Sequence, residues 1–103
     1  MIDKETARRL VLKHLSASKT SPPMEVAILD ENTIETEFGW VFFWNSKLYR
    51  ETGEFKYALA GNAPIIVDRQ DGSLHETSTA YAIEEIIENY RKSHPRKPSE
   101  VTI

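Results

Sequence analysis

The sequence lacks cysteine, long hydrophobic runs and any excess of positive charge. Without cysteine it can form neither a disulfide nor a thiolate zinc site, which is compatible with a reducing cytoplasm. The longest mostly apolar run near the middle, Phe38 to Trp44, is far shorter than the roughly 20 residues that span a bilayer. A secretion signal needs an apolar stretch near the amino terminus, but that region carries the charged residues Asp3, Lys4, Glu5, Arg8 and Arg9. We therefore expect a cytoplasmic protein with no part in a membrane.

The charge balance argues against nucleic acid as a general partner. The 13 Lys and Arg residues are outnumbered by 16 Asp and Glu, for a net charge of -3, whereas general nucleic-acid binders present a basic face to phosphate. The stretch from Thr20 to Ser46 has no Lys, Arg or His and carries the acidic residues Glu25, Asp30, Glu31, Glu35 and Glu37. Basic residues gather at the carboxyl end, where we expect a flexible basic tail over residues 94–103.

Length and composition predict one domain, over residues 1–93, because 103 residues of which 40% are hydrophobic can bury a single core. A first helix is predicted over about 4–16, since Asp3 can cap it and apolar residues recur at helical spacing at Ala7, Leu10, Val11 and Leu15. Residues 16–23 include Pro22 and Pro23 and predict a linker. A final helix is predicted over about 82–92, with acidic residues near its start, basic residues near its end and an apolar stripe of Ile83, Ile86, Ile87 and Tyr90.

Two strands are predicted between Met24 and Asn45, over about 24–29 and about 33–45, with a turn at Asp30–Asn32. Alternation along the second strand assigns one face to the core under the helices: Ile34, Phe38, Trp40, Phe42 and Trp44. The other face begins acidic, at Glu35 and Glu37, and ends apolar, at Val41 and Phe43. Val41 and Phe43 are predicted either to be exposed as an interface or to be covered by another segment such as residues 55–59. Gly39 is compatible with a bulge.

The remainder predicts a hairpin after an irregular segment. Residues 47–63 contain turn residues near Gly53 and Gly61 and are long for a connection. This predicts either a functional loop or a short element, for which a helical turn at 57–59 is a candidate. After Pro64, an apolar run is followed by a tight turn at Asp71 and Gly72 and a further strand. The order of elements predicts an α+β fold: an antiparallel sheet of about four strands with an amino-terminal and a carboxyl-terminal helix packed on one face.

No spacing in the sequence predicts a catalytic, metal or cofactor site. His14, His75 and His94 share no metal-ligand interval. The segment from Asp68 to His75 resembles the start of a calcium loop, but Gly72 comes one position too early, so a hairpin turn is expected. Residues 61–64 lack a phosphate-binding glycine pattern and are interpreted as a turn. We therefore expect a binding protein rather than an enzyme, with no metal and no cofactor.

The second half of the chain carries a family resemblance, whose most specific block runs from Gly61 to Asp68. The matching positions are Phe38, Gly39, Trp40, Val41, Phe42, Tyr49, Glu51, Thr52, Gly53, the run from Leu59 to Asp68, Gly72, His75, Thr79, Ile83, Glu84, Glu85 and Tyr90. On these residues the chain resembles the YrhB-like family, also called immunity protein 35. It departs from that pattern at Ser78 and Ala82, where the family tends to have glycine and proline. We interpret the motif residues as structural: Trp40, Gly53, Gly61, Asn62, Pro64 and Asp68.

The resemblance implies a small cytoplasmic α+β protein, encoded beside polymorphic toxins, that binds and neutralises a cognate toxin without catalytic residues of its own. One relative in that family is described as a heat-shock chaperone, so the alternative is a holdase that binds unfolded chains. A defined one-to-one complex would distinguish immunity from holdase activity. Charge and exposure along the second strand predict a partner surface that consists of Glu31, Glu35, Glu37, Val41 and Phe43. The alternative is an ordinary solvated strand face, whose charge discourages pairing at a sheet edge.

Overall fold

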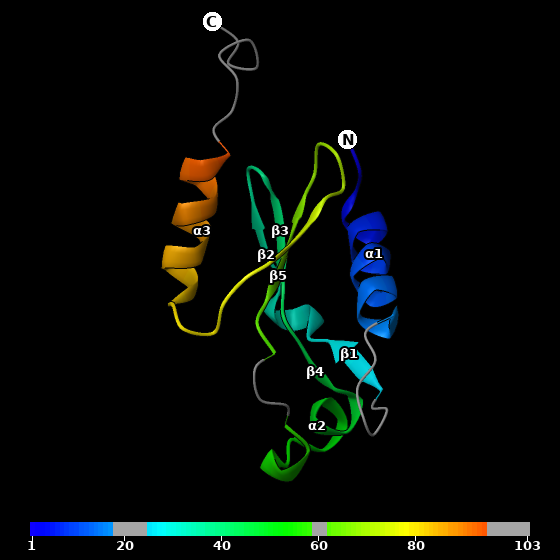
Figure 1. Cartoon of the computed structure of the whole chain (residues 1–103). Helices are drawn as coiled ribbons and strands as arrows, with labels where there is room; N and C mark the ends of the chain where they lie inside the picture. Colours follow the sequence, from blue (N-terminus) through cyan, green and yellow to red (C-terminus); the bar gives the residue numbers. More distant parts are fainter. Residues whose placement is uncertain (18–24, 59–61, 95–103) are drawn as a thin grey trace, which may run out of the picture.

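The computed structural model describes residues 1–17, 25–58 and 62–94 (Figure 1). Its helices are α1 (Lys4–Ala17), α2 (Lys47–Thr52) and α3 (Ile83–Ser93), with short 3₁₀ turns η1 (Asp30–Asn32) and η2 (Phe55–Tyr57). Its strands are β1 (Val26–Ile28), β2 (Ile34–Thr36), β3 (Gly39–Phe42), β4 (Trp44–Ser46), β5 (Ile65–Asp68) and β6 (Leu74–Glu76). The predicted linker falls largely outside the described residues, as does the tail beyond residue 94.

The strands form two antiparallel sheets. One has four strands in the order β2-β3-β5-β6, and the other pairs β1 with β4. Both faces of the central strands β3 and β5 are covered, because β3 is buried along its whole length and β5 at all but its last residue. The predicted α+β class, with an antiparallel sheet of four strands and a helix near each end, is confirmed.

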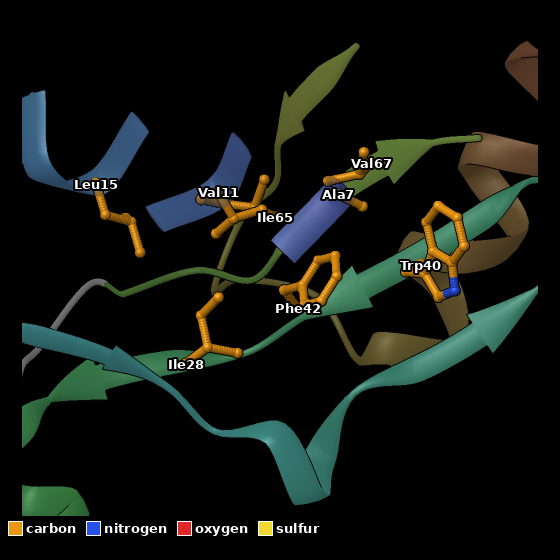
Figure 2. Close-up of a cluster of buried hydrophobic side chains, with 8 residues drawn as sticks. All are labelled: Ala7, Val11, Leu15, Ile28, Trp40, Phe42, Ile65 and Val67. Carbon is orange, nitrogen blue, oxygen red and sulfur yellow. The ribbon is translucent and has the colours of Figure 1, made fainter. Parts of the chain in front are cut away.

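Helix α1 forms where the sequence predicts it. The backbone N–H of Thr6 donates to Asp3 Oδ1 at 2.8 Å, which supplies one of the hydrogen bonds that a helix amino terminus otherwise lacks. One helix face is buried at Ala7, Val11 and Leu15, the three-four spacing of an amphipathic helix. This face packs on Trp40, Phe42, Ile65 and Val67 of the larger sheet and on Ile28 of the smaller one (Figure 2).

The prediction of one long strand over residues 33–45 is wrong, because the chain reverses at Glu37 and Phe38. Strand β2 pairs back on β3, with Ile34 opposite Val41 and Thr36 opposite Gly39. Gly39 permits the reversal, since it has a φ of +152° and a Cβ there would lie 2.0 Å from the carbonyl oxygen of Val67. It marks a turn and a close backbone approach rather than a bulge.

This reversal changes which residues share a face. Residues opposite each other in an antiparallel pair point to the same side of the sheet, so even-numbered Ile34 lies with odd-numbered Val41. Helix α3 covers this side, where the buried residues are Phe38, Val41, Ile66, Ile86 and Tyr90. Trp40 and Phe42 point to the opposite side, under α1. The two helices therefore lie on opposite faces of the sheet and not on one face as predicted (Figure 1).

The carboxyl-terminal half matches the sequence more closely. Strands β5 and β6 form the predicted hairpin, and Gly72 at its turn has a φ of +72°. Two hydrogen bonds close the turn: Gly72 N–H donates to the Asp68 carbonyl at 2.9 Å and Ser73 N–H to Asp71 Oδ1 at 2.9 Å. The irregular segment after β4 contains α2, which was not predicted, and its helical turn lies at Phe55–Tyr57 rather than at 57–59.

Candidate functional site

The chain from 47 to 57, here called the α2–η2 corner, lies at one end of the molecule, beyond the sheets (Figure 1). Ser46 caps its helix, since Ser46 Oγ accepts from Tyr49 N–H at 3.0 Å. The helix ends at Gly53, which is left-handed at a φ of +72° and donates its N–H to the Tyr49 carbonyl at 2.7 Å. Thr52 Oγ1 then accepts from Glu54 N–H at 3.2 Å. These bonds fix the path of the backbone into η2.

The corner presents large apolar side chains to solvent. Phe55 is 85% exposed and Leu48 is 49% exposed. The ring of Phe55 contacts only the side of Tyr49 among the described aromatic residues, with ring centroids 6.3 Å apart. Single exposed apolar residues are common, but two on one short and well-capped segment are typical of a protein contact surface.

Ion pairs connect the corner to the rest of the fold. Lys47 lies 3.4 Å from Glu25, before β1, and Arg50 lies 3.7 Å from Asp30, in η1. Asp30 is in turn held by Arg8 of α1, which donates to both of its carboxylate oxygens. The corner is therefore connected through Asp30 to helix α1.

The sequence predicted that residues 47–63 were either a functional loop or held a short element, but it did not single out the α2–η2 corner as a candidate contact surface. It placed Phe55 among residues that could cover Val41 and Phe43, yet Phe55 covers neither. The available signal was an aromatic residue between two charged ones, Glu54 and Lys56, directly after the Thr52–Gly53 turn. A position between two charged residues, directly after a turn, is a poor one for a core residue.

The three predicted acidic contact residues are surface residues, but two of them have basic neighbours. Glu35 lies 3.2 Å from Arg69, and Glu37 is held by the guanidinium of Arg91, whose second nitrogen is 3.0 Å from Glu37 Oε1. The hydrogen bond from Arg91 to Glu37, and to a smaller extent the one to Glu88, raises the pKa of Arg91 above its ordinary value. Glu31 is exposed on η1, and the described residues give it no ion pair.

Of the two predicted apolar contact residues, Val41 is buried, so its prediction as an exposed contact residue is wrong, whereas Phe43 keeps part of its surface exposed. Val41 is fully buried on β3, between β2 and β5. Phe43 is half-buried and packs against the cluster that Val41 forms with residues of α3. Helix α3 packs on their side of the sheet, whereas both helices were predicted on the other side. In the folded protein Val41 cannot contact a partner.

The family-motif residues take structural positions where they are described. Trp40 is 3% exposed, and Gly53 ends α2. Asn62 Nδ2 donates to the Trp44 carbonyl at 2.7 Å. Buried Pro64 accepts from Thr77 Oγ1 at 2.6 Å, and Asp68 Oδ2 accepts from the hydroxyl of Tyr90 at 2.6 Å. Gly61 lies outside the described residues.

The histidines take part in packing. His14 Nε2 lies 2.8 Å from Glu76 Oε1 and connects α1 to the edge strand β6. His75 and His94 both pack on the ring of Tyr90, at centroid distances of 5.0 and 4.0 Å, and Ser73 Oγ lies 2.8 Å from His75 Nε2. In residues 1–17, 25–58 and 62–94 no group of three His, Asp or Glu side chains could hold a metal ion. Nor does this part of the chain contain a helix long and apolar enough to span a membrane.

Comparison with known proteins gives a family and one similar curated protein. The model of the family described as immunity protein 35 matches residues 5–93. An uncharacterized protein, YrhB of Escherichia coli (strain K12), is 40% identical over 52 residues, which are 50% of this chain and 55% of YrhB. The chain thus spans about half the length of this curated relative. No solved structure matches the chain significantly.

Proposed function

Because the chain belongs to the immunity protein 35 family, we propose that it binds one cognate bacterial toxin and neutralises it by covering the toxin's active site or substrate groove. The α2–η2 corner is the proposed contact surface. The observation that carries this choice is Phe55, an aromatic side chain 85% exposed on a backbone that is fixed by capping hydrogen bonds. A preorganised aromatic residue loses little conformational entropy when it enters a pocket on a partner.

The acidic residues of the β2–β3 hairpin have a separate role in this proposal, and they lie on both of its faces. Glu35 is opposite Trp40, on the α1 side, and pairs with Arg69, whereas Glu37 lies in the turn and pairs with Arg91 of α3. Together with Glu31 of η1 and Glu88 of α3 they outnumber Arg69 and Arg91, so a net negative charge remains. If the toxin acts on nucleic acid, its groove must be basic, and this charge would steer the two proteins together. Steering affects the association rate, whereas Phe55 and Leu48 would hold the complex together.

The proposal requires no catalysis by this chain. An inhibitor that occupies a groove acts by stoichiometric binding, so one molecule is needed for each toxin molecule. The proposed location is the cytoplasm, where the toxin would be made. A holdase would differ in stoichiometry, since it would bind many unrelated unfolded chains.

The direct experiment uses the toxin encoded beside the gene. Purified toxin and the full chain should form a one-to-one complex on size-exclusion chromatography, and co-expression should rescue growth. Phe55→Ser should weaken binding at least about tenfold, which is about 1.4 kcal/mol, and Leu48→Ser should weaken it less. Both side chains are exposed, so the variants should melt like the wild type.

Tyr81→Ser is the matched control, because Tyr81 is an exposed aromatic residue, at 59%, away from the α2–η2 corner. It should bind as the wild type does. Normal binding by Phe55→Ser would remove the corner from the interface. A complete absence of a complex with the wild-type chain would overturn the proposed neutralisation itself.

A further inference from the structure

Helix α3 covers one face of the four-stranded sheet with few buried residues of its own. Only Ile86 and Tyr90 are buried, while Ile83 and Ile87 are half-buried. Beneath them lies an apolar strip of fully buried side chains, Phe38, Val41 and Ile66. In the described part of the chain, no other helix lies on this side of the sheet (Figure 1).

The core on the other face does not depend on α3. Its buried residues come from α1, β1, β3 and β5, and the two clusters share no residue. Trp40 and Phe42, for example, pack against Ala7 and Val11 of α1 (Figure 2). When two clusters share no residue, the contacts of one cluster can be lost while those of the other persist.

The amino-terminal end of α3 is joined to the sheet mainly by the chain itself. Thr77 is anchored by its bond to the Pro64 carbonyl, but residues 79–82 are exposed. Ala82, the capping residue of α3, has no side chain that can accept a hydrogen bond. Among the described residues, no hydrogen bond or ion pair fastens positions 79–87 to the sheet.

The polar connections are concentrated in the last turn of α3. Tyr90 donates its hydroxyl to Asp68 at the end of β5, at 2.6 Å. Arg91 donates two hydrogen bonds to Glu37 in the β2–β3 turn. The ring of Tyr90 also packs on Phe38, with centroids 4.6 Å apart. We call these two polar contacts, Tyr90–Asp68 and Arg91–Glu37, the latch.

We propose that α3 is a hinged cover, which swings about residues 77–82 when the latch opens and exposes the strip of Phe38, Val41 and Ile66 while the α1 side stays folded. The hinge and the latch lie at opposite ends of the helix, so once the latch opens, mainly the apolar contacts of Ile83, Ile86 and Ile87 hold α3 against the sheet. This property belongs to the fold and does not depend on the identity of the toxin.

Native-state hydrogen exchange on the full chain tests the cover. In the wild type, the amides of α3 should exchange at least about tenfold faster than those of β3 and α1, as expected for a segment that opens without global unfolding. Arg91→Ala should accelerate the α3 amides by a further two- to fivefold, about the contribution of an exposed ion pair, and leave the α1 amides unchanged. High salt should act on the wild type in the same direction.

Two further variants keep the test decisive. Tyr90→Phe retains the ring but removes the bond to Asp68, so it should fold and should also accelerate only α3. Arg9→Ala, which removes the exposed Arg9–Glu5 pair of α1, is the matched control and should leave the α3 amides unchanged. A single exchange rate shared by α3, β3 and α1 would overturn the cover, and faster α3 exchange that neither latch variant alters would overturn the latch.

Discussion

The side-chain amide of Asn62 donates a hydrogen bond to the backbone carbonyl of Trp44 at 2.7 Å, and the Trp44 indole donates in turn to the carbonyl of Ala63, next to Asn62, at 2.8 Å. These two bonds connect Asn62 and Ala63, which precede β5, to Trp44 of β4 in the smaller sheet. They give a physical reason for an asparagine at this point of the family motif, because its side chain supplies the donor that the Trp44 carbonyl requires.

Asn62→Ala should therefore lower stability without directly affecting partner binding. Loss of the donor leaves a half-buried carbonyl unpaired, which costs about 1–3 kcal/mol. The midpoint of thermal unfolding, followed by circular dichroism, should fall, whereas toxin binding at low temperature should be unchanged. Asn89→Ala, at an exposed position of α3, is the control. Normal stability with abolished binding would make Asn62 a contact residue.

Trp40→Ala should destabilise the protein strongly. The indole is 3% exposed and packs under α1, and removal of such a side chain costs about 3–5 kcal/mol, a large part of the stability of a small domain. Chemical denaturation should reveal a much lower midpoint or no cooperative transition. Tyr81→Ala, at an exposed site, should change stability by less than about 0.5 kcal/mol. Cooperative melting of Trp40→Ala at the wild-type midpoint would contradict the assigned core.

Asp30 predicts a pH-dependent contribution to stability. Hydrogen bonds from Arg8 hold the pKa of Asp30 below its ordinary value of 3.8. A carboxyl group with a lowered folded-state pKa stabilises the fold above its unfolded-state pKa, and this contribution disappears as the pH falls through the folded value. Because both side chains are partly exposed, the contribution should be below about 1 kcal/mol.

Asp30→Asn should thus be less stable than the wild type near neutral pH, and the difference should shrink as the pH falls below 3.8. Urea unfolding of both proteins across this range measures the difference. Glu51→Gln, at an exposed position of α2, controls for the general loss of a negative charge. A difference that stays constant with pH would show that the Arg8–Asp30 bond is not its source.

Reversing the acidic charges tests electrostatic steering. Glu35→Lys combined with Glu37→Lys should slow association with a toxin that acts on nucleic acid and should weaken the dependence of that rate on salt. Stopped-flow measurements over a range of salt concentrations give both quantities, and circular dichroism should check that the variant remains folded. Glu5→Lys on α1 is the control for a charge reversal elsewhere. An unchanged rate with the same salt slope would show that the acidic residues of the hairpin do not steer association.

The sequence-based prediction of the sheet was wrong at Glu37 and Phe38, where one long strand was predicted and the chain reverses. Alternation of side chains continues through Glu37 and Phe38, so the pattern itself contains no sign that the strand reverses. The turn places Ile34 on the same side of the sheet as Val41. Helix α3, predicted on the same face as α1, covers this side instead, so Val41 is fully buried and not on the surface. The glycine at position 39 was interpreted as compatible with a bulge, and only the structure shows that its positive φ belongs to the reversal.

The sequence by itself determined the elements whose causes are local. The cap at Asp3, the helical spacing of Ala7 and Val11, and the turn at Gly72 act within a few residues, so they predicted α1 and the β5–β6 hairpin correctly. The motif from Gly61 to Asp68 likewise identified the family, because a family pattern is a property of the sequence.

Only the tertiary structure decided which charges and apolar groups remain available. The stretch from Thr20 to Ser46 contains no basic residue, yet the fold brings Arg8 to Asp30, Arg69 to Glu35 and Arg91 to Glu37. It also buries Val41 beneath α3 and leaves Phe55 exposed. These outcomes depend on contacts between residues 22 to 54 positions apart, and the free energy of such contacts is set by which elements pack together, a quantity that no local pattern encodes.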